Sequence, residues 1–509
     1  MSSLRHVEQC ISRQLAHKKL NAYVTAPTAA TLRSTAQALD APSTQPLRGR
    51  LISLKDNIAS LKSSSEPTTC SSQALEGYTS PIPSTVAKLL HEAGAIVAGK
   101  TNMDEFGMGS HSQSLFSGTV QSHLHRAESS SPLSAGGSSG GSAIAVATGQ
   151  CWAALGTDTG GSVRLPAAWT GTVGFKPTYG RISRYGVVDY ANSLDTVGII
   201  STSVQNTRSV FHVLDQHDPK DPTSLSSRTR SRLRSSPISS SPSHLRIGIP
   251  KEYNVSGLHP SVRSAWTRTL CLLQDQGHTL VPVSLPSTPL ALSAYYILAP
   301  AEASSNLARY DGVEYGFRPE GPDAVAVKDK DQGKGQESVL YAKTRGRAFG
   351  AEVRRRILLG TYTLSSGAFG NYFLQAQKVR RMVRGEFDGV FSTQNMLVRS
   401  SREVEQDTQR GGGQEVGQEK VDVLIAPTAP TLPPTLEEVE RQTAVERYLG
   451  DVLTVPASLA GLPVVSVPVP LEGDFEEGEV STVGMQVIGQ VGDDERVLGV
   501  GEVVEGLFR

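Results

Sequence analysis

Two glycine-rich stretches, AGGSSGGSA at Ala135–Ala143 and DTGGSVRLPA at Asp158–Ala167, lie close together in the first half of the chain. The first stretch leads directly into an apolar segment with helical character, so its glycines belong to an ordered loop rather than to a linker. Loops of this kind bring backbone amides close to a phosphate or to an oxyanion. Neither stretch has the GK[ST] end of a P-loop or the GxGxxG pattern, and the sequence therefore favours an oxyanion site.

The second stretch also contains a candidate nucleophile. Ser162 follows TGG, and the backbone amides of Thr159, Gly160 and Gly161 are candidates for an oxyanion hole that stabilises developing negative charge. No GxSxG elbow surrounds this serine, so the sequence does not indicate the Ser–His arrangement of the α/β-hydrolases. A lysine is the alternative base. Lys55 ends the apolar run of LISLKDNIA, where desolvation can lower the pKa of an amine until it is neutral and basic.

Composition excludes several classes of protein. The chain has 509 residues with 49 Lys plus Arg against 49 Asp plus Glu, and this zero balance argues against a broad basic surface for nucleic acid. Its four cysteines are scattered without CxxC spacing, which favours a reducing compartment and gives no zinc site. The histidine pair at His123 and His125 is more typical of solvated loop residues than of metal ligands, and we expect no metal in this chain. The longest apolar stretch, Ala143–Leu155, is too short to span a membrane.

Helical and strand-like patterns alternate along the whole chain, which favours an α/β sandwich around one large mixed sheet. We expect a single domain over 1–509 with a helical segment at about 1–45 and three low-complexity insertions, at 223–243, 328–336 and 399–420, which we expect to be flexible. Buried strands are expected at Ala95–Ala98, Leu245–Ile249, Val423–Ile425 and Val464–Val467. Helices are expected at Ser84–Glu92, Ser261–Gln276 and Thr443–Val452.

Taken together, KDN at Lys55 and the two glycine-rich stretches resemble the amidase signature family. This resemblance implies a Ser, cis-Ser, Lys triad in which Ser162 is the nucleophile and Lys55 the base. The bridging serine is then Ser138, in a cis peptide with Gly137. Ser139 is an adjacent alternative for the bridging role. The spacing of 24 residues between Ser138 and Ser162 favours Ser138, because it matches the spacing between the two serines of the family's triad.

Longer sequence motifs indicate which branch of the family the chain resembles. GKTNMDEFGMGS at Gly99, AEASSNLARYDG at Ala301 and LTVPASLAGLP at Leu453 are similar to the glutaminase subunits, known as the A-type, of glutamyl-tRNA(Gln) amidotransferases. The resemblance covers nearly the whole chain outside the three insertions. It implies glutamine as substrate, and the positions that match the substrate-binding residues are Tyr295, Arg356 for the carboxylate and Asp451 for the ammonium group. Arg354 and Arg355 are adjacent alternatives to Arg356.

The same resemblance implies an assembly. A partner of the B-type uses ATP and Mg²⁺, and Glu-tRNA(Gln) binds mainly through this partner. A small C-type subunit or its equivalent bridges the two chains, and this chain carries no cofactor. It also implies a mitochondrial location in the matrix, although the first residues show no clear cleavable presequence. Two other functions stay open at this point: a free-standing amidase acting on a small or aryl amide, and a catalytically inactive assembly factor.

Overall fold

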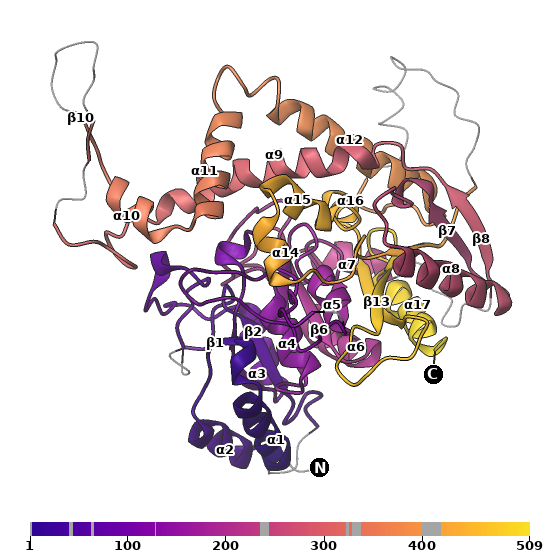
Figure 1. Ribbon diagram of the computed structural model, residues 1–509, viewed down its shortest axis with the longest axis horizontal. Helices are drawn as coiled ribbons and strands as arrows, with labels where there is room; N and C mark the ends of the chain where they lie inside the picture. The colour runs from indigo at the N-terminus through magenta and orange to yellow at the C-terminus, as the bar shows by residue number, and fades with distance from the viewer. Residues whose placement is uncertain are drawn as a thin grey trace.

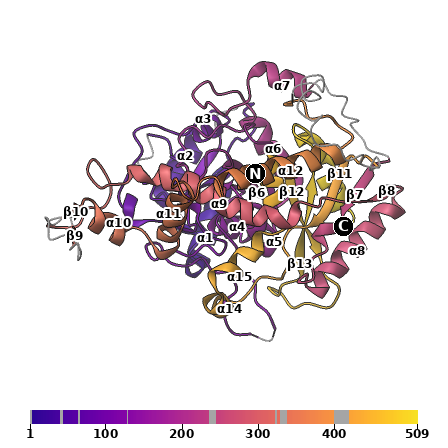
Figure 2. The ribbon, with the colours of Figure 1, turned by 90° about the horizontal axis from the view of Figure 1, so that it is seen from above.

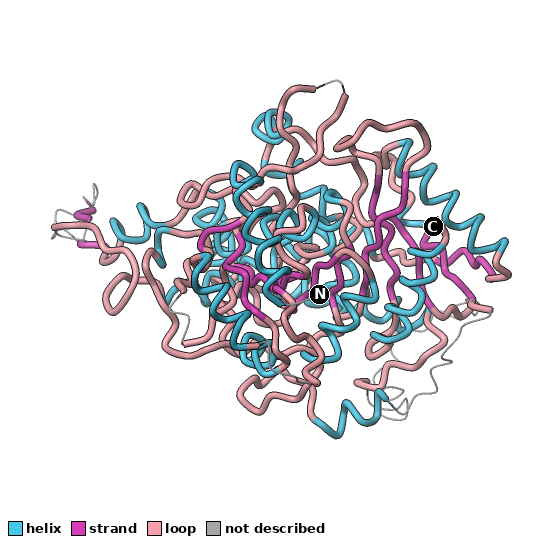
Figure 3. Tube along the Cα trace, turned by 90° about the horizontal axis from the view of Figure 1, so that it is seen from below, coloured by secondary structure: helices cyan, strands magenta, loops and turns pink. Residues whose placement is uncertain are grey.

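The computed structural model of the chain describes residues 3–39, 44–62, 66–127, 129–234, 244–321, 325–327, 337–398 and 419–508. In this described part, one mixed sheet of eleven strands forms the centre, with helices on both sides (Figures 1 and 3). The expected α/β class is thereby confirmed. The strand order across the sheet is β1 (Tyr23–Thr25), β3 (Ile96–Thr101), β2 (Leu51–Lys55), β4 (Ala153–Asp158), β6 (Thr196–Ser201), β5 (Val173–Lys176), β12 (Val464–Pro470), β13 (Thr482–Ile488), β11 (Val423–Pro427), β7 (Arg246–Pro250) and β8 (Thr279–Val283). A separate hairpin pairs β9 (Val325–Val327) with β10 (Glu337–Val339).

Strand direction explains where the site forms. β2 runs parallel to both β3 and β4, whereas the central pairs from β4 through β6, β5, β12 and β13 to β11 are antiparallel. Because β2 and β4 are parallel neighbours, their carboxyl ends meet at the same edge of the sheet. β2 ends at Lys55 and β4 ends at Asp158, just before the TGGS stretch. The topology therefore brings the two sequence motifs together although they are about a hundred residues apart.

The helices in chain order are α1 (Ser3–Ala16), α2 (Ala29–Ala38), α3 (Thr85–Glu92), α4 (Gly140–Ala147), α5 (Arg164–Thr170), α6 (Val204–Leu214), α7 (Ser227–Arg234), α8 (Pro260–Asp275), α9 (Thr288–Asn306), α10 (Ala342–Ala348), α11 (Ala351–Thr363), α12 (Phe373–Val390), α14 (Leu436–Arg441), α15 (Ala444–Tyr448), α16 (Val455–Ala460) and α17 (Asp494–Gly506). Helices α9, α11 and α12 pack together along the top of the molecule in Figure 1. None of the described helices is long and apolar enough to cross a membrane.

Most predicted elements are present with small shifts in their ends. Local signals explain two helix starts: Ser84 caps α3 by accepting a hydrogen bond from the amide of Ala87, and α8 begins with Pro260, which needs no amide partner at that position. The helix predicted at Thr443–Val452 is divided into α15 and a 3₁₀ turn, Leu449–Asp451. Gly450 lies within that turn, and glycine is a poor helix former.

The expectation for the first insertion is wrong in part. Residues 227–234 form α7, because the side chain of Arg230 is buried and donates to the carbonyls of Gly180 and Arg181 as well as to the carboxylate of Asp215. Leu233 is buried on the same helix. Residues 235–243, the second insertion and 399–418 of the third lie outside the described residues.

Candidate active site

The side chain of Lys55 is completely buried at the end of β2 and lies on Ser138. Its Nζ donates to Ser138 Oγ at 2.7 Å and to the Oγ1 and carbonyl of Thr157 at 3.0 and 3.3 Å. Burial lowers the pKa of Lys55 to about 7, although nearby carboxylates oppose the shift. An amine with this pKa is largely neutral above pH 7 and can accept a proton.

The loop that carries Ser138 has the geometry that the resemblance implied. The Gly137–Ser138 peptide bond is cis, and Ser138 is buried. The neighbouring Ser139 hydroxyl faces the Thr157 carbonyl at 3.4 Å, whereas Ser138 is the serine on Lys55. The structure therefore brings Ser138 to the lysine and turns its rival away.

Ser162 lies on the loop between β4 and α5 and is partly exposed. The amide of Ser139 donates to the carbonyl of Ser162 at 3.1 Å, which joins the loop of the candidate nucleophile to the loop of Ser138. All three residues of the proposed triad thus come from segments that meet at one edge of the sheet.

Close packing requires both glycines of the TGGS stretch. A Cβ at Gly160 would lie 2.7 Å from Cζ of Tyr295, and a Cβ at Gly161 would lie 2.9 Å from Cβ of Thr454 and 3.4 Å from a carboxylate oxygen of Asp451. In the described part of the chain, no group accepts a hydrogen bond from the amides of these two glycines. The hydroxyl of Thr159 donates to Asp195 at 2.7 Å, which fixes the start of the loop. The amides remain available for an oxyanion.

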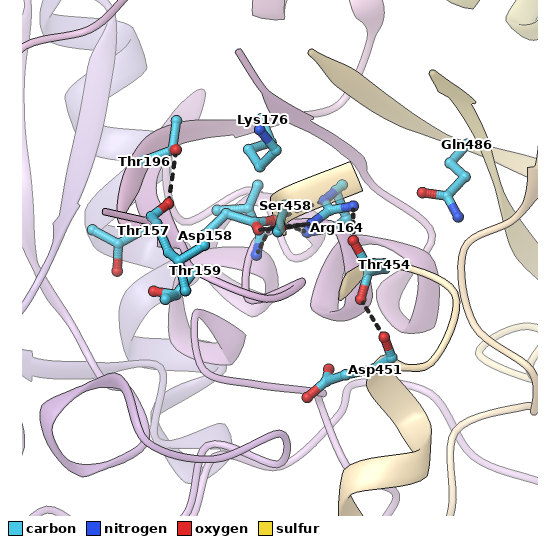
Figure 4. Close-up of polar contacts among 12 residues, drawn as sticks. Thr157, Asp158, Thr159, Arg164, Lys176, Thr196, Asp451, Thr454, Ser458 and Gln486 are labelled. Carbon is cyan, nitrogen blue, oxygen red and sulfur yellow. Dashed lines mark hydrogen bonds and ion pairs between the residues drawn. The ribbon is translucent and has the colours of Figure 1, made fainter. Parts of the chain in front are cut away.

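A buried ion pair fixes the other end of this loop (Figure 4). Arg164 and Asp158 are both fully buried and form two hydrogen bonds, at 2.9 and 2.8 Å. Asp158 also accepts from the amide of Val163, and Arg164 reaches the carbonyl of Thr454 and the hydroxyl of Ser458. Burial raises the pKa of Asp158, but the Arg164 guanidinium more than offsets this effect and keeps the pKa below its usual value.

Arg356 lies in a cage of aromatic rings. Its guanidinium carbon is 5.7, 5.2 and 5.5 Å from the ring centres of Tyr190, Tyr296 and Tyr448, and Nη1 donates to the Tyr190 hydroxyl at 2.6 Å. Nε donates to Glu352, one turn earlier on α11, at 2.8 Å.

Of the three consecutive arginines on α11, Arg356 is the buried one. Arg355 is exposed and pairs with Glu352, and Arg354 is exposed and donates to the carbonyl of Gly346. The geometry therefore favours Arg356 over both alternatives for a site inside the protein.

Asp451 lies beside the same cage. Its Oδ2 accepts from Ser110 at 3.0 Å and from the hydroxyl of Tyr296 at 3.2 Å, so Tyr296 contacts both Asp451 and Arg356. Burial raises the pKa of Asp451 to about 6, which leaves the carboxylate ionised at neutral pH. Tyr295 is buried on α9 with its ring against Tyr296 and close to Gly160.

A protein-family model described as Amidase matches residues 5–498. The chain belongs to the amidase family. Among curated relatives, this amidase is 51% identical to the A subunit of the mitochondrial glutamyl-tRNA(Gln) amidotransferase of Ajellomyces capsulatus over the full length of both chains. It is 52% identical to the protein of the same name from Emericella nidulans, covering 99% of this chain and 100% of that protein. The expected family is thereby confirmed.

Solved structures give the same result for the fold. The crystal structure of the A subunit of glutamyl-tRNA(Gln) amidotransferase from Thermotoga maritima matches the amidase with a TM-score of 0.71 and 29% identity, covering 100% of this chain and 94% of that one. A crystal structure described as an amidase matches with a TM-score of 0.72 and 27% identity, covering 100% of this chain and 97% of that one.

Several residues of the site were absent from the sequence analysis. Asp158 and Arg164 could have been suspected from their positions inside the DTGGSVR stretch, but their pairing depends on the turn between β4 and α5. Ser110 and the cage tyrosines were missed because their neighbours in space are far away in the sequence. The spacing of Glu352 and Arg356, one helical turn apart, is a local signal for their contact.

Proposed function

We propose that this amidase hydrolyses glutamine and supplies the released ammonia for the conversion of Glu-tRNA(Gln) to Gln-tRNA(Gln). One observation carries the proposal: the buried Lys55 donates a hydrogen bond to Ser138 in an amidase chain that is 51% identical, over its whole length, to a protein named for this reaction. The lysine has the pKa that the chemistry needs, and the relatives supply the substrate class.

The charges around the site suit glutamine. A free amino acid brings an ammonium group and a carboxylate, which need an anion and a cation respectively. Asp451 and Arg356 provide this pair, and Tyr296 contacts both. Tyr295 closes the site against the nucleophile loop. An apolar or aryl amide has no group for a buried guanidinium and a buried carboxylate, so the free-standing amidase on such a substrate fits less well.

The geometry supports a hydrolysis in two stages. Neutral Lys55 accepts a proton through Ser138 as Ser162 Oγ attacks the carboxamide carbon of glutamine. The amides of Thr159, Gly160 and Gly161 stabilise the negative charge on the tetrahedral oxygen. The carbon–nitrogen bond then breaks, and protonated Lys55 returns the proton to the leaving ammonia. Water then attacks the carbonyl carbon of the glutamyl ester on Ser162, and Lys55 accepts its proton through Ser138. The bond to Ser162 Oγ breaks, the proton returns to that oxygen and glutamate is released.

The remaining parts of the reaction belong to partners. A B-type partner chain activates the glutamyl group of Glu-tRNA(Gln) with ATP and Mg²⁺ and accepts the ammonia. A small C-type subunit or its equivalent joins the two chains. This chain then needs no cofactor of its own. The curated relatives are named mitochondrial, and we place the assembly in the matrix, where organellar translation uses its product.

The test separates ammonia supply from ammonia use. Ser162→Ala in the purified complex abolishes glutamine hydrolysis, while transamidation with added ammonium continues. Unchanged glutaminase activity in the variant would reject the assignment of Ser162. Labelling of the wild-type chain with a serine-reactive probe distinguishes an active enzyme from an inactive assembly factor, and Ser162→Ala is the control that should not label.

A further inference from the structure

A cavity that none of the triad residues lines lies at the carboxyl end of α16. It has a volume of about 370 Å³, and three arginines of α12, Arg380, Arg381 and Arg384, line it together with Tyr179 and Thr223. No aspartate or glutamate is among the described residues of its lining. In a chain whose net charge is zero, this arrangement concentrates positive charge at one place.

The arginines differ in what they bind. Arg380 is used within the protein, because it donates to the carbonyl of Leu459 and to Ser193. Arg381 is exposed, and its side chain donates no hydrogen bond to the described residues. Arg384 has a buried Nε without an acceptor in the part of the chain that the structure describes.

A fourth arginine adds to the site. Arg184 lies with its guanidinium 5.6 Å from the ring centre of Tyr179 and donates from Nε to Thr223, yet its buried Nη1 has no acceptor in the described structure. Buried donors without partners are costly unless a ligand satisfies them. One of these two guanidinium groups, that of Arg384, lines the cavity, and the other, that of Arg184, contacts the lining residues Tyr179 and Thr223. Together they indicate a ligand with several anionic oxygens, and phosphate groups match guanidinium donors well.

The basic surface continues outside the cavity. Helix α7 lies next to it, because Thr223 and Leu225 just before the helix line the cavity and Arg232 donates to the carbonyl of Met396, beside the lining residue Leu397. Arg228 is exposed on the same helix. Helix α7 lies at the periphery of the molecule in Figure 2. Positive charge spread over two helices fits a chain of phosphates better than one small anion.

We propose that this surface, defined by Arg184, Arg381 and Arg384 and extended by α7, binds the phosphodiester backbone of the RNA substrate. The inference rests on the proposed function for the identity of the RNA. It adds a direct role for this chain in holding tRNA, which the zero net charge alone did not predict.

Binding of fluorescently labelled tRNA(Gln) to the purified complex tests the proposal. Arg381→Ala removes one exposed charge and should weaken binding about tenfold at 0.1 M salt and reduce the salt slope by about one. Arg381→Ala with Arg384→Ala should reduce the slope by about two. The matched control is Arg33→Ala, an exposed arginine of α2 paired with Glu8, which should change neither quantity.

Three outcomes overturn the proposal. The first is an unchanged tRNA affinity in both variants. The second is that the variants lose the partner subunits from the purified complex rather than tRNA binding. The third is that inorganic phosphate binds at the cavity while the substitutions leave the tRNA affinity unchanged. Glutamine hydrolysis without tRNA, measured in parallel, should stay at the wild-type rate. If the wild-type complex hydrolyses no glutamine, the proposed function fails while the RNA measurement keeps its meaning.

Discussion

The state of one amine, that of Lys55, controls the proposed chemistry. Because burial lowers its pKa to about 7, the base is protonated and inactive in acid and becomes neutral as the pH rises. We expect kcat/KM for glutamine to rise about tenfold per pH unit where Lys55 alone titrates and to level off above the pKa of the lysine. Below about pH 6 the rise should be steeper, because Asp451 also becomes protonated there. Glutaminase rates between about pH 5.5 and about pH 9 measure this profile.

Lys176 provides a matched control for that profile. It is also fully buried with a pKa lowered by burial to about 7, but its Nζ donates to the carbonyl of Pro177 rather than to a serine. Lys176→Met should keep the acid limb near its wild-type position while it changes stability. Lys55→Met should lower kcat by about 10²–10⁴, as expected for loss of a general base. An acid limb that disappears in the Lys176 variant would show that the wrong lysine had been assigned.

Arg356 is the residue whose role depends most on geometry. Arg356→Lys keeps the charge but loses the planar fork and the stacking on three tyrosines, so we expect KM for glutamine to rise about 10- to 100-fold. Arg355→Lys, at the exposed neighbouring position, should leave KM unchanged. Steady-state kinetics of the two variants compare them directly, and equal effects would contradict the choice of Arg356.

At the level of elements, the nucleophile loop depends on the absence of a side chain. Gly161→Ala places a Cβ against Thr454 in a region with no free space, so α16 or the loop must shift. We expect a loss of about 1–3 kcal/mol in the free energy of unfolding, with a larger relative loss of glutaminase activity. Gly385→Ala on α12 meets open space and should instead stabilise the protein by up to about 1 kcal/mol. Denaturant unfolding and activity assays on both variants test this contrast.

The buried Asp158–Arg164 pair holds the same loop from the other side. Removing one partner leaves an uncompensated buried charge, and we expect Arg164→Met to cost about 3–5 kcal/mol of the free energy of unfolding. Asp158→Asn with Arg164→Met leaves no charge behind and should recover part of that loss. Thermal and urea unfolding of the single and double variants measure the coupling, and equal destabilisation by both would contradict it.

The same elements show how far sequence reasoning reaches. Lys55 and Ser162 stood out because each lies in a short stretch with a chemical pattern of its own, whereas Ser138 followed from the resemblance to the amidase signature family. The predicted strands were recognisable as short buried runs. The Arg356 cage was not predictable, because its tyrosines come from three separate segments: Tyr190 from the loop before β6, Tyr296 from α9 and Tyr448 from α15. Helix α7 was missed for a related reason: a serine- and arginine-rich segment looks unable to fold until a buried carboxylate pairs with Arg230.

At the scale of the whole molecule, the active site joins two halves of the chain. Lys55 and Ser138 come from the first half, whereas Arg356 and Asp451 come from the second, and the sheet continues between the halves through the pairing of β5 with β12. One hydrophobic core extends along both parts of the sheet. If the halves separated, β5 and β12 would each become an edge strand exposed to water. We therefore propose that the chain unfolds as one domain.

Two tryptophans can test this proposal. Trp152 lies just before β4 in the first half, and Trp266 lies on α8 in the second, where its indole donates to the carbonyl of Ile425. Variants that lack Trp169 and keep only one of these two tryptophans should give the same urea midpoint by fluorescence. Glutaminase activity should disappear at that midpoint, because the site needs both halves. Midpoints that differ between the two reporters would divide the chain into separate domains, and activity lost before either transition would place the weakest contact at the active site itself.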